Sequence, residues 1–98
     1  MKKAIKPEYI LRLFVTGATP NSARAVTNIK SICEEHIRGK YFLEIIDLYD
    51  HREMAELQQV VAVPMLIKIL PAPVQKLIGD MSDNKKVFEA LGLTMEGV

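Results

Sequence analysis

Apolar and β-branched positions predict two strands joined by a helix in the first half of the chain. The run Tyr9–Val15 is almost continuously apolar, which is typical of a strand that is buried on both faces. Thr19 and Pro20 fit the cap and the first position of a helix, and Gly39 is its natural stop. A second strand is predicted over Tyr41–Leu48. Strand, helix and strand in this order imply a right-handed parallel crossover.

One face of the predicted helix carries apolar residues spaced three or four positions apart, which is the period of an amphipathic helix. This stripe consists of Val26, Ile29, Ile32, Cys33 and Ile37. Cys33 is the only cysteine, so no intramolecular disulfide can form. Its place on the stripe favours a buried structural thiol.

The second half of the chain predicts one short helix and two further strands. Asp50 and Glu53 resemble a capping box, which would open a helix that continues to about Gln59. The runs Val60–Leu70 and Val74–Ile78 are apolar and β-branched, and prolines separate them. We therefore expect both runs to contain strands.

The chain is expected to end in a helix that Ser82 caps and in which Val87, Phe88 and Leu91 share a face. The predicted order is therefore β-α-β-α-β-β-α, which is the order of the thioredoxin fold, an α/β class. In that fold an X-Pro bond at the start of the third strand faces the first helix. Pro64 occupies that position, and such a bond is often cis.

Composition and charge narrow the classes of function. A chain of 98 residues fits one domain, residues 1–98, and 49% hydrophobic with 26% charged residues is typical of a globular protein. The net charge of +1 is too small for a sequence-independent nucleic-acid binder. The stretch Val60–Ile67 is too short to span a bilayer, and the N-terminus does not resemble a signal peptide. We expect a cytoplasmic protein without a nucleic-acid or membrane partner.

The loop before the first helix would carry Cys-x-x-Cys in a redox thioredoxin, where the helix N-terminus lowers the thiol pKa. Here the loop is Gly17-Ala-Thr-Pro-Asn-Ser22 and contains no thiol. An alternative hypothesis is a thiol enzyme that uses Cys33. A metal pair of Cys33 and His36 is geometrically possible, but no further Cys or His completes a tetrahedral site. We expect no catalytic residue, metal or cofactor.

Prolines occur at three places in the second half: Pro64, Pro71 and Pro73. X-Pro bonds isomerise slowly, so these residues could gate a slow structural change. They could instead fix the geometry of a loop, which is the interpretation that the residues by themselves favour. The possibility of a slow structural change stays open.

Motifs spread over the chain, from Tyr9 to Leu93, resemble those of one known family. The matching stretches are Tyr9-Ile-Leu-Arg-Leu-Phe-Val15, Gly17-Ala-Thr-Pro-Asn-Ser22 with Arg24-Ala25, Ile46-Asp47-Leu48, Ala62-Val-Pro-Met-Leu66, Lys68-Ile-Leu-Pro-Ala-Pro-Val74, and Lys76-Leu-Ile-Gly-Asp-Met-Ser-Asp83 with Lys86-Val87. The chain is similar to the KaiB family, which comprises the fold-switching protein of the cyanobacterial circadian clock and KaiB-like proteins of other bacteria.

The resemblance implies a non-enzymatic regulator that binds a KaiC-type ring ATPase and modulates its phosphorylation or ATPase cycle, in a clock or in stress timing. It implies a thioredoxin-like fold with a possible alternative KaiB-type fold of the second half, diverging from Pro64 through Pro73. It also implies self-association as a dimer or tetramer. Under this interpretation, Arg24, Lys40 and Tyr41 are the expected contacts with the ATPase.

Several positions depart from the pattern of clock KaiB proteins, and one of them is Ala72, which interrupts a run of prolines that is common in those proteins. Ala90 replaces a glycine and Gly92 replaces an aspartate, and both changes are expected to favour the thioredoxin-like fold. Glu44 and Gln59 stand where the clock protein has basic residues that contact KaiC. A third hypothesis is therefore a self-associating module that no longer binds KaiC.

Overall fold

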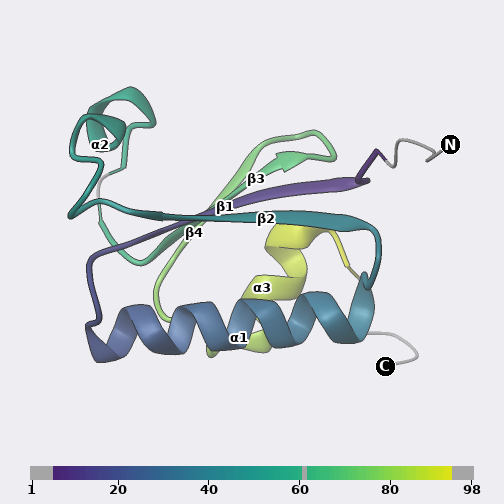
Figure 1. Cartoon of the computed structure of the whole chain (residues 1–98). Helices are drawn as coiled ribbons and strands as arrows, with labels where there is room; N and C mark the ends of the chain where they lie inside the picture. Colours follow the sequence, from purple (N-terminus) through teal and green to yellow (C-terminus); the bar gives the residue numbers. More distant parts are fainter. Residues whose placement is uncertain (1–5, 61, 94–98) are drawn as a thin grey trace, which may run out of the picture.

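The computed structural model describes residues 6–60 and 62–93, which form a four-stranded sheet and three helices (Figure 1). In chain order the elements are β1 (Tyr9–Val15), α1 (Pro20–His36), β2 (Tyr41–Asp47), α2 (Glu53–Leu57), β3 (Met65–Leu70), β4 (Gln75–Ile78) and α3 (Asn84–Leu91). This is the predicted order β-α-β-α-β-β-α. Among the described residues, no helix combines the length and the apolar character needed to cross a membrane.

The sheet has the strand order β2-β1-β3-β4. β1 runs parallel to β2 and antiparallel to β3, and β3 runs antiparallel to β4. Because β1 lies between two strands and has side chains on two covered faces, Leu13 and Phe14 are both fully buried. The prediction that this strand is buried on both faces is therefore confirmed at Leu13 and Phe14, whereas Ile10 and Arg12, on the same face as Phe14, are only partly buried.

The helices α1 and α3 lie against the same face of the sheet (Figure 1). This face holds the larger core, to which β1, α1, β3 and α3 all contribute. Its buried residues are Leu11, Leu13, Val15, Ala25, Ile29, Ile32, Cys33, Ile37, Leu66, Met81, Val87, Phe88 and Leu91. The opposite face has a smaller core, made of Phe14, Ile46, Met65 and Ile67. Apart from the partly buried Val26, the predicted apolar stripe of α1 is buried.

The first helix begins as predicted and ends earlier. Thr19 caps α1 through its side chain, and Pro20 is the first helical residue. The helix stops at His36 because Ile37 leaves the helical conformation, with a φ of −135°, although its N–H still bonds to the Cys33 carbonyl. Gly39 lies in the turn that follows, with a φ of +77°.

The predicted capping box of the second helix is wrong. Asp50 lies in a turn after β2, where its N–H donates to the Asp47 carbonyl at 3.1 Å. The helix α2 begins only at Glu53, and Arg52, at the cap position, makes no side-chain capping bond. The turn therefore occupies the residues that the sequence pattern assigned to the start of the helix.

The cap of the last helix is also one residue away from the prediction. Asp83 caps α3, since its Oδ1 accepts a hydrogen bond from the Lys86 N–H at 3.2 Å. The N–H of Ser82 instead donates to Asp80 Oδ1 at 3.0 Å. The predicted buried face of Val87, Phe88 and Leu91 is confirmed.

The long apolar run Val60–Leu70 contributes a strand only from Met65 onward. The N–H of Val60 bonds to the Ala55 carbonyl, which extends the end of α2. Pro64 immediately precedes β3, as predicted, and its carbonyl accepts a hydrogen bond from the Gly79 N–H at 2.9 Å. The peptide bonds before all three prolines of this half are cis.

Candidate functional site

Two side-chain hydroxyl groups hold the loop between β1 and α1 by accepting backbone hydrogen bonds. Thr19 Oγ1 accepts a hydrogen bond from the Ser22 N–H at 3.3 Å. Ser22 Oγ accepts one from the Thr16 N–H at 3.2 Å, and its residue is only 2% exposed. Both side chains thus fix the start of the helix.

Asp47, at the end of β2, stabilises the same loop from the other side. Its Oδ1 accepts hydrogen bonds from the Gly17 N–H at 3.0 Å and the Tyr49 N–H at 2.9 Å. These two bonds lower the pKa of the Asp47 carboxyl, the bond from Gly17 contributing most. Gly17 has a φ of +54°, which favours glycine at this position. The carboxylate is therefore a structural acceptor for two loops.

Cys33 has the environment of a structural thiol. The side chain is fully buried in the larger core. Burial, with a smaller effect of the neighbouring Glu34 charge, raises the pKa of the Cys33 thiol to about 12. A nucleophilic cysteine needs a thiolate near neutral pH, so this environment favours packing over chemistry.

His36 points toward α3, where its ring meets the ring of Phe88 edge-on at a centroid distance of 4.7 Å. The contact joins the end of the first helix to the last one. In residues 6–60 and 62–93, no group of three or more His, Cys, Asp or Glu side chains could hold a metal ion.

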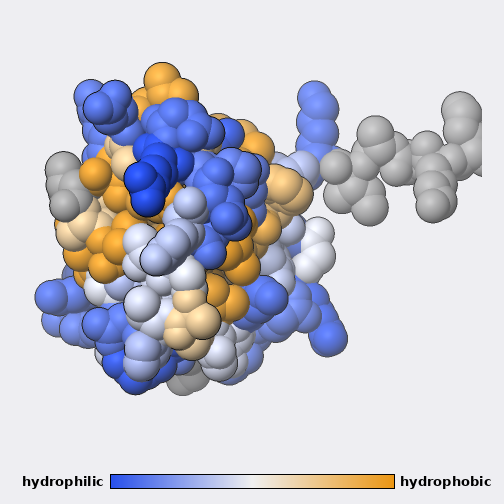
Figure 2. Space-filling view, turned by 60° about the vertical axis from the view of Figure 1, so that its left-hand side comes forward, coloured by the Kyte–Doolittle hydropathy of each residue, from blue (hydrophilic) through white to orange (hydrophobic). Residues whose placement is uncertain are grey.

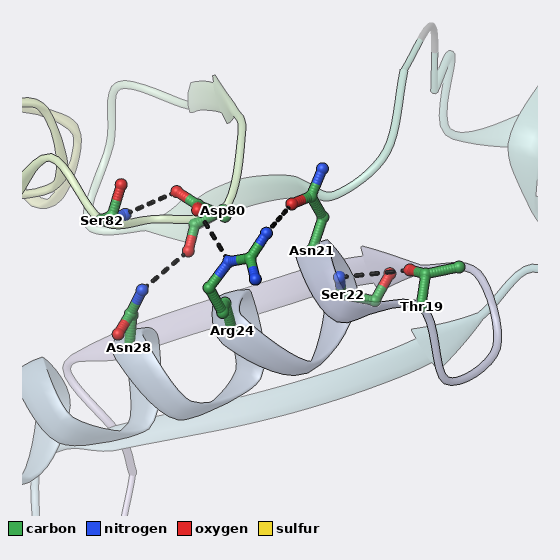
Figure 3. Close-up of polar contacts among 7 residues, drawn as sticks. All are labelled: Thr19, Asn21, Ser22, Arg24, Asn28, Asp80 and Ser82. Carbon is green, nitrogen blue, oxygen red and sulfur yellow. Dashed lines mark hydrogen bonds and ion pairs between the residues drawn. The ribbon is translucent and has the colours of Figure 1, made fainter.

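Arg24 connects α1 to the turn between β4 and α3 (Figure 3). Its Nε donates to Asp80 Oδ2 at 3.2 Å, and its Nη2 donates to Asn21 Oδ1. Asn28, one helical turn further along, donates through Nδ2 to the Asp80 carbonyl at 3.0 Å. The Arg24 side chain remains 55% exposed. Arg24 thus links α1 to the turn before α3 and is also accessible at the surface.

Asp80 is the acceptor at the centre of this cluster. Hydrogen bonds from Ser82 make the largest contribution to lowering the pKa of its carboxyl, and the bond and charge of Arg24 add to this. Nothing in the sequence pattern joined Arg24 to Asp80, which lies 56 positions later. The sequence could have predicted only the local bond between Asp80 and the N–H of Ser82, because an aspartate commonly bonds the backbone N–H two residues further on.

The structure places Lys40 and Tyr41 at the other end of α1 from Arg24. From Arg24 to the end of the helix the chain rises about 18 Å at 1.5 Å per residue. The exposed Lys40 accepts hydrogen bonds from the N–H groups of Glu8 and Tyr9 through its carbonyl. The predicted contacts are therefore not one compact cluster.

Tyr41 is partly buried at the start of β2, and its hydroxyl donates to Glu34 Oε2 at 2.8 Å. This bond is the main cause that raises the Tyr41 pKa to about 12. The ring is thus held against the last turns of α1.

The remaining predicted positions lie in the second half. Pro71 and Pro73 lie in the turn between β3 and β4. Ala90 is 9% exposed within α3. Gly92 ends α3 in a left-handed conformation, and its N–H bonds to the carbonyls of Glu89 and Phe88. Gly92 thus stops the helix as predicted.

The family model of the KaiB domain matches residues 12–93 of the chain. A circadian clock oscillator protein KaiB from Microcystis aeruginosa is 45% identical over 93 residues, which cover 95% of this chain and 89% of that protein. Its counterpart from a Nostoc species is 46% identical over 96 residues, which cover 98% of this chain and 88% of that protein.

Solved structures with the same arrangement include the N-terminal domain of SasA from Synechococcus elongatus. It superimposes with a TM-score of 0.71 at 27% identity, covering 100% of this chain and 95% of that one. Mitochondrial thioredoxin 3 from Saccharomyces cerevisiae superimposes with a TM-score of 0.70 at 10% identity, covering 89% and 79%. The predicted thioredoxin-like α/β fold is confirmed.

Proposed function

Since this chain belongs to the KaiB family, we propose that it is a non-enzymatic regulator that binds a KaiC-type ring ATPase and modulates its phosphorylation or ATPase cycle. The observation that carries the proposal is the match to KaiB clock proteins along almost the whole chain. We propose that residues 1–98 act as one domain in the cytoplasm, in a clock or in another form of timing.

The geometry at the start of α1 supports a binding role over a thiol enzyme. The loop 17–19 contains no thiol, and the one cysteine is buried with a raised pKa. The side-chain oxygens of Thr19 and Ser22 both accept backbone hydrogen bonds. This region can present a shaped surface but offers no nucleophile with an adjacent base.

Among the residues at the start of α1, Arg24 is the one that we expect to contribute most to contact with the ATPase. Its guanidinium is more than half exposed while Asp80 and Asn21 hold its orientation. A guanidinium fixed in this way can pair a carboxylate of the partner in two hydrogen bonds with little further loss of side-chain entropy. Lys40 and Tyr41 extend the proposed surface to the far end of α1.

The test is binding of the full chain to the KaiC-type ATPase of the same organism, measured by biolayer interferometry and by the rate of ATP hydrolysis. We expect Arg24→Glu to weaken binding about tenfold or more, because it places a carboxylate where a cation is required. Lys30→Glu is the matched control, since it makes the same charge change at another exposed position of α1. Its affinity should equal that of the parent chain.

Arg24→Glu also breaks the contact with Asp80, so a second variant separates the two roles. Asp80→Asn leaves Arg24 in place and removes the negative charge that pairs with it, while the amide oxygen of asparagine can still accept the hydrogen bond from the Ser82 N–H. Retained binding by Asp80→Asn and lost binding by Arg24→Glu support direct contact. Absence of any complex with the ATPase would contradict the proposed function. Equal binding by Arg24→Glu and Lys30→Glu would contradict the placement of the contact at Arg24.

Self-association is the second part of the proposal. We propose that the chain also forms a dimer or tetramer, and that this assembly competes with the complex between the chain and the ATPase. Mass action favours the assembly at high protein concentration. Light scattering across a concentration series, with and without the ATPase, measures this competition.

A further inference from the structure

The strand β4 forms the edge of the sheet opposite β2, and no described strand lies beyond it (Figure 1). Three of its four residues, Gln75, Lys76 and Ile78, are exposed. Ile78 is 52% exposed, and Val74, just before the strand, is 57% exposed. On the side of the molecule that carries α2, apolar surface is interleaved with strongly hydrophilic side chains (Figure 2). Apolar contact by itself therefore has little direction there, whereas the backbone groups of an unpaired strand are directional.

The hydrogen bonds between β3 and β4 determine which backbone groups of β4 point outward. The Gly79 N–H donates to the Pro64 carbonyl at 2.9 Å. Because bonded and non-bonded opposite residues alternate in an antiparallel pair, Leu77 directs its N–H and C=O toward β3. Lys76 and Ile78 therefore direct theirs away from the sheet. Among the described residues, no backbone group of another segment bonds to these outward groups.

We propose that this edge joins two copies of the chain, with β4 pairing antiparallel to β4 of a second copy about a two-fold axis at Leu77. The proposal deepens the self-association part of the proposed function and rests on it. In this register Lys76 lies opposite Ile78 of the second copy, and the reverse pair is equivalent. The outward groups then form about four hydrogen bonds, two in each opposite pair. The sheets of the two copies, with four strands each, continue into one another.

Charge and hydrogen bonding select this register over its neighbours. A two-fold axis at Lys76 sets two ammonium groups directly opposite each other, which is unfavourable, and bonds only that pair within the strand. An axis at Ile78 likewise bonds a single pair. An axis between two residues sets an outward residue opposite one that points toward β3, so neither is bonded. The axis at Leu77 avoids these losses and brings two partly buried Leu77 side chains together on the face that holds the larger core.

A second copy fits this edge better than a nucleic acid or an unrelated segment. The strand is complementary to itself, since the two-fold register sets each Lys76 beside an isoleucine and not beside another charge. The net charge of +1 gives two copies little mutual repulsion. Nucleic acid requires several phosphate contacts, whereas β4 has one cation. Its four residues are far fewer than the roughly 20–30 per side of a standard interface, so the dimer should be weak, with a Kd of about 100 µM or higher.

The first test follows the full chain, labelled with ¹⁵N, from about 20 µM to 2 mM by sedimentation equilibrium and by amide hydrogen exchange. The mean mass should rise toward that of a dimer. The amide signals of Lys76 and Ile78 should shift and exchange more slowly at high concentration, because their N–H groups become bonded. Those of Gln75 and Leu77 already bond to β3 and should change much less. Association through side chains alone would not produce this alternation.

Two substitutions of Ile78 test the register through the sign of a charge. Ile78→Lys places an ammonium group opposite Lys76 of the second copy, whereas Ile78→Glu places a carboxylate there. Both remove the same exposed apolar side chain, so their difference reports the charge. The Ile78→Glu dimer should be about fivefold or more tighter than the Ile78→Lys dimer, since each dimer contains the pair twice. Phe42→Lys and Phe42→Glu, matched controls at 54% exposure on β2, should differ by less than about twofold.

The outcomes separate this proposal from the proposed function. A chain that stays monomeric up to about 2 mM overturns both the β4 pairing and self-association, while binding to the ATPase is judged by its own assay. Equal association of Ile78→Lys and Ile78→Glu, or shifts that lie elsewhere, overturns the β4 pairing alone. So does a second set of signals for residues 65–91, which would show that association accompanies refolding. Changes at Lys76 and Ile78 on adding the ATPase, but not on concentrating the chain, would assign the edge to the ATPase and also overturn the pairing.

Discussion

Substitution of Gly92 by alanine measures how strongly the last helix depends on its cap. Gly92 has a φ of +76°, a left-handed conformation that costs an alanine about 1 kcal/mol. A Cβ at this position would lie 3.9 Å from Lys68 Nζ, which is an ordinary contact, so no clash adds to this cost. We expect Gly92→Ala to lower the free energy of unfolding by about 1 kcal/mol and Tm by about 4–8 °C.

Gly39→Ala is the matched control for this substitution. Gly39 has a φ of +77°, and a Cβ added there would meet no atom within 4 Å, so its backbone cost is the same. Gly39 lies between α1 and β2, in the half that both proposed folds share, whereas the α3 cap belongs to the thioredoxin-like arrangement. Gly92→Ala should therefore raise the share of an alternative second-half fold about fivefold, and Gly39→Ala should leave that share unchanged.

Urea denaturation followed by circular dichroism gives the stabilities, and ¹⁵N spectra of residues 65–91 give the populations of the two folds. Gly92→Asn should lose less stability than Gly92→Ala, because asparagine tolerates the left-handed conformation better. A Gly92→Ala protein as stable as the parent would refute the backbone argument. A population shift of the same size in Gly39→Ala would refute the assignment of the effect to the α3 cap.

Three further predictions test other parts of the structure. Asp83→Ala should lower the free energy of unfolding by about 1 kcal/mol through loss of the α3 cap, while Ser82→Ala should cost less, as measured by urea denaturation. Cys33 should not react with a thiol reagent at pH 8 until the chain unfolds, because burial raises its pKa to about 12. The chain should also not reduce insulin. Insulin reduction that disappeared in Cys33→Ser would contradict this prediction. The pKa of Asp47 is lowered in the folded state, so its contribution is present above the ordinary carboxyl pKa of about 4 and is lost as the pH falls through the lower folded value. Asp47→Asn should therefore be less stable than the parent at pH 7, and the difference should shrink below pH 4; a constant difference would contradict the assignment.

The order of the elements could be predicted because each follows from a local pattern. Continuous apolar residues identified Tyr9–Val15 with the bounds that β1 has, and Thr19 with Pro20 identified the start of α1. The misplaced caps, at Asp50 and Ser82, have one cause. Several residues near a helix start can accept a backbone hydrogen bond, and the turn before the helix decides which of them does so.

The site was less predictable because its contacts join distant parts of the chain. The resemblance to the KaiB family identified Arg24 as a candidate contact, but its link to Asp80 depends on how the turn before α3 packs against α1. Lys68 shows the same limit, since it is only 4% exposed although lysine is rarely buried. It lies on the helix-covered face of β3 near the C-terminus of α3, where a helix favours a cation. Neither arrangement has a signature in local spacing.

The position of β1 in the sheet has a consequence for any state in which the second half rearranges. Among the described strands, those of the first half meet those of the second half only where β1 pairs with β3. Removing β3 and β4 would leave β1 and β2 as a two-stranded sheet with the N–H and C=O groups of β1 unpaired along one side. Such an edge is a template for another strand, and a single pair of strands has little stability in water. A chain that releases its second half therefore exposes β1 until that strand pairs again, and pairing with a neighbouring chain would couple refolding to assembly.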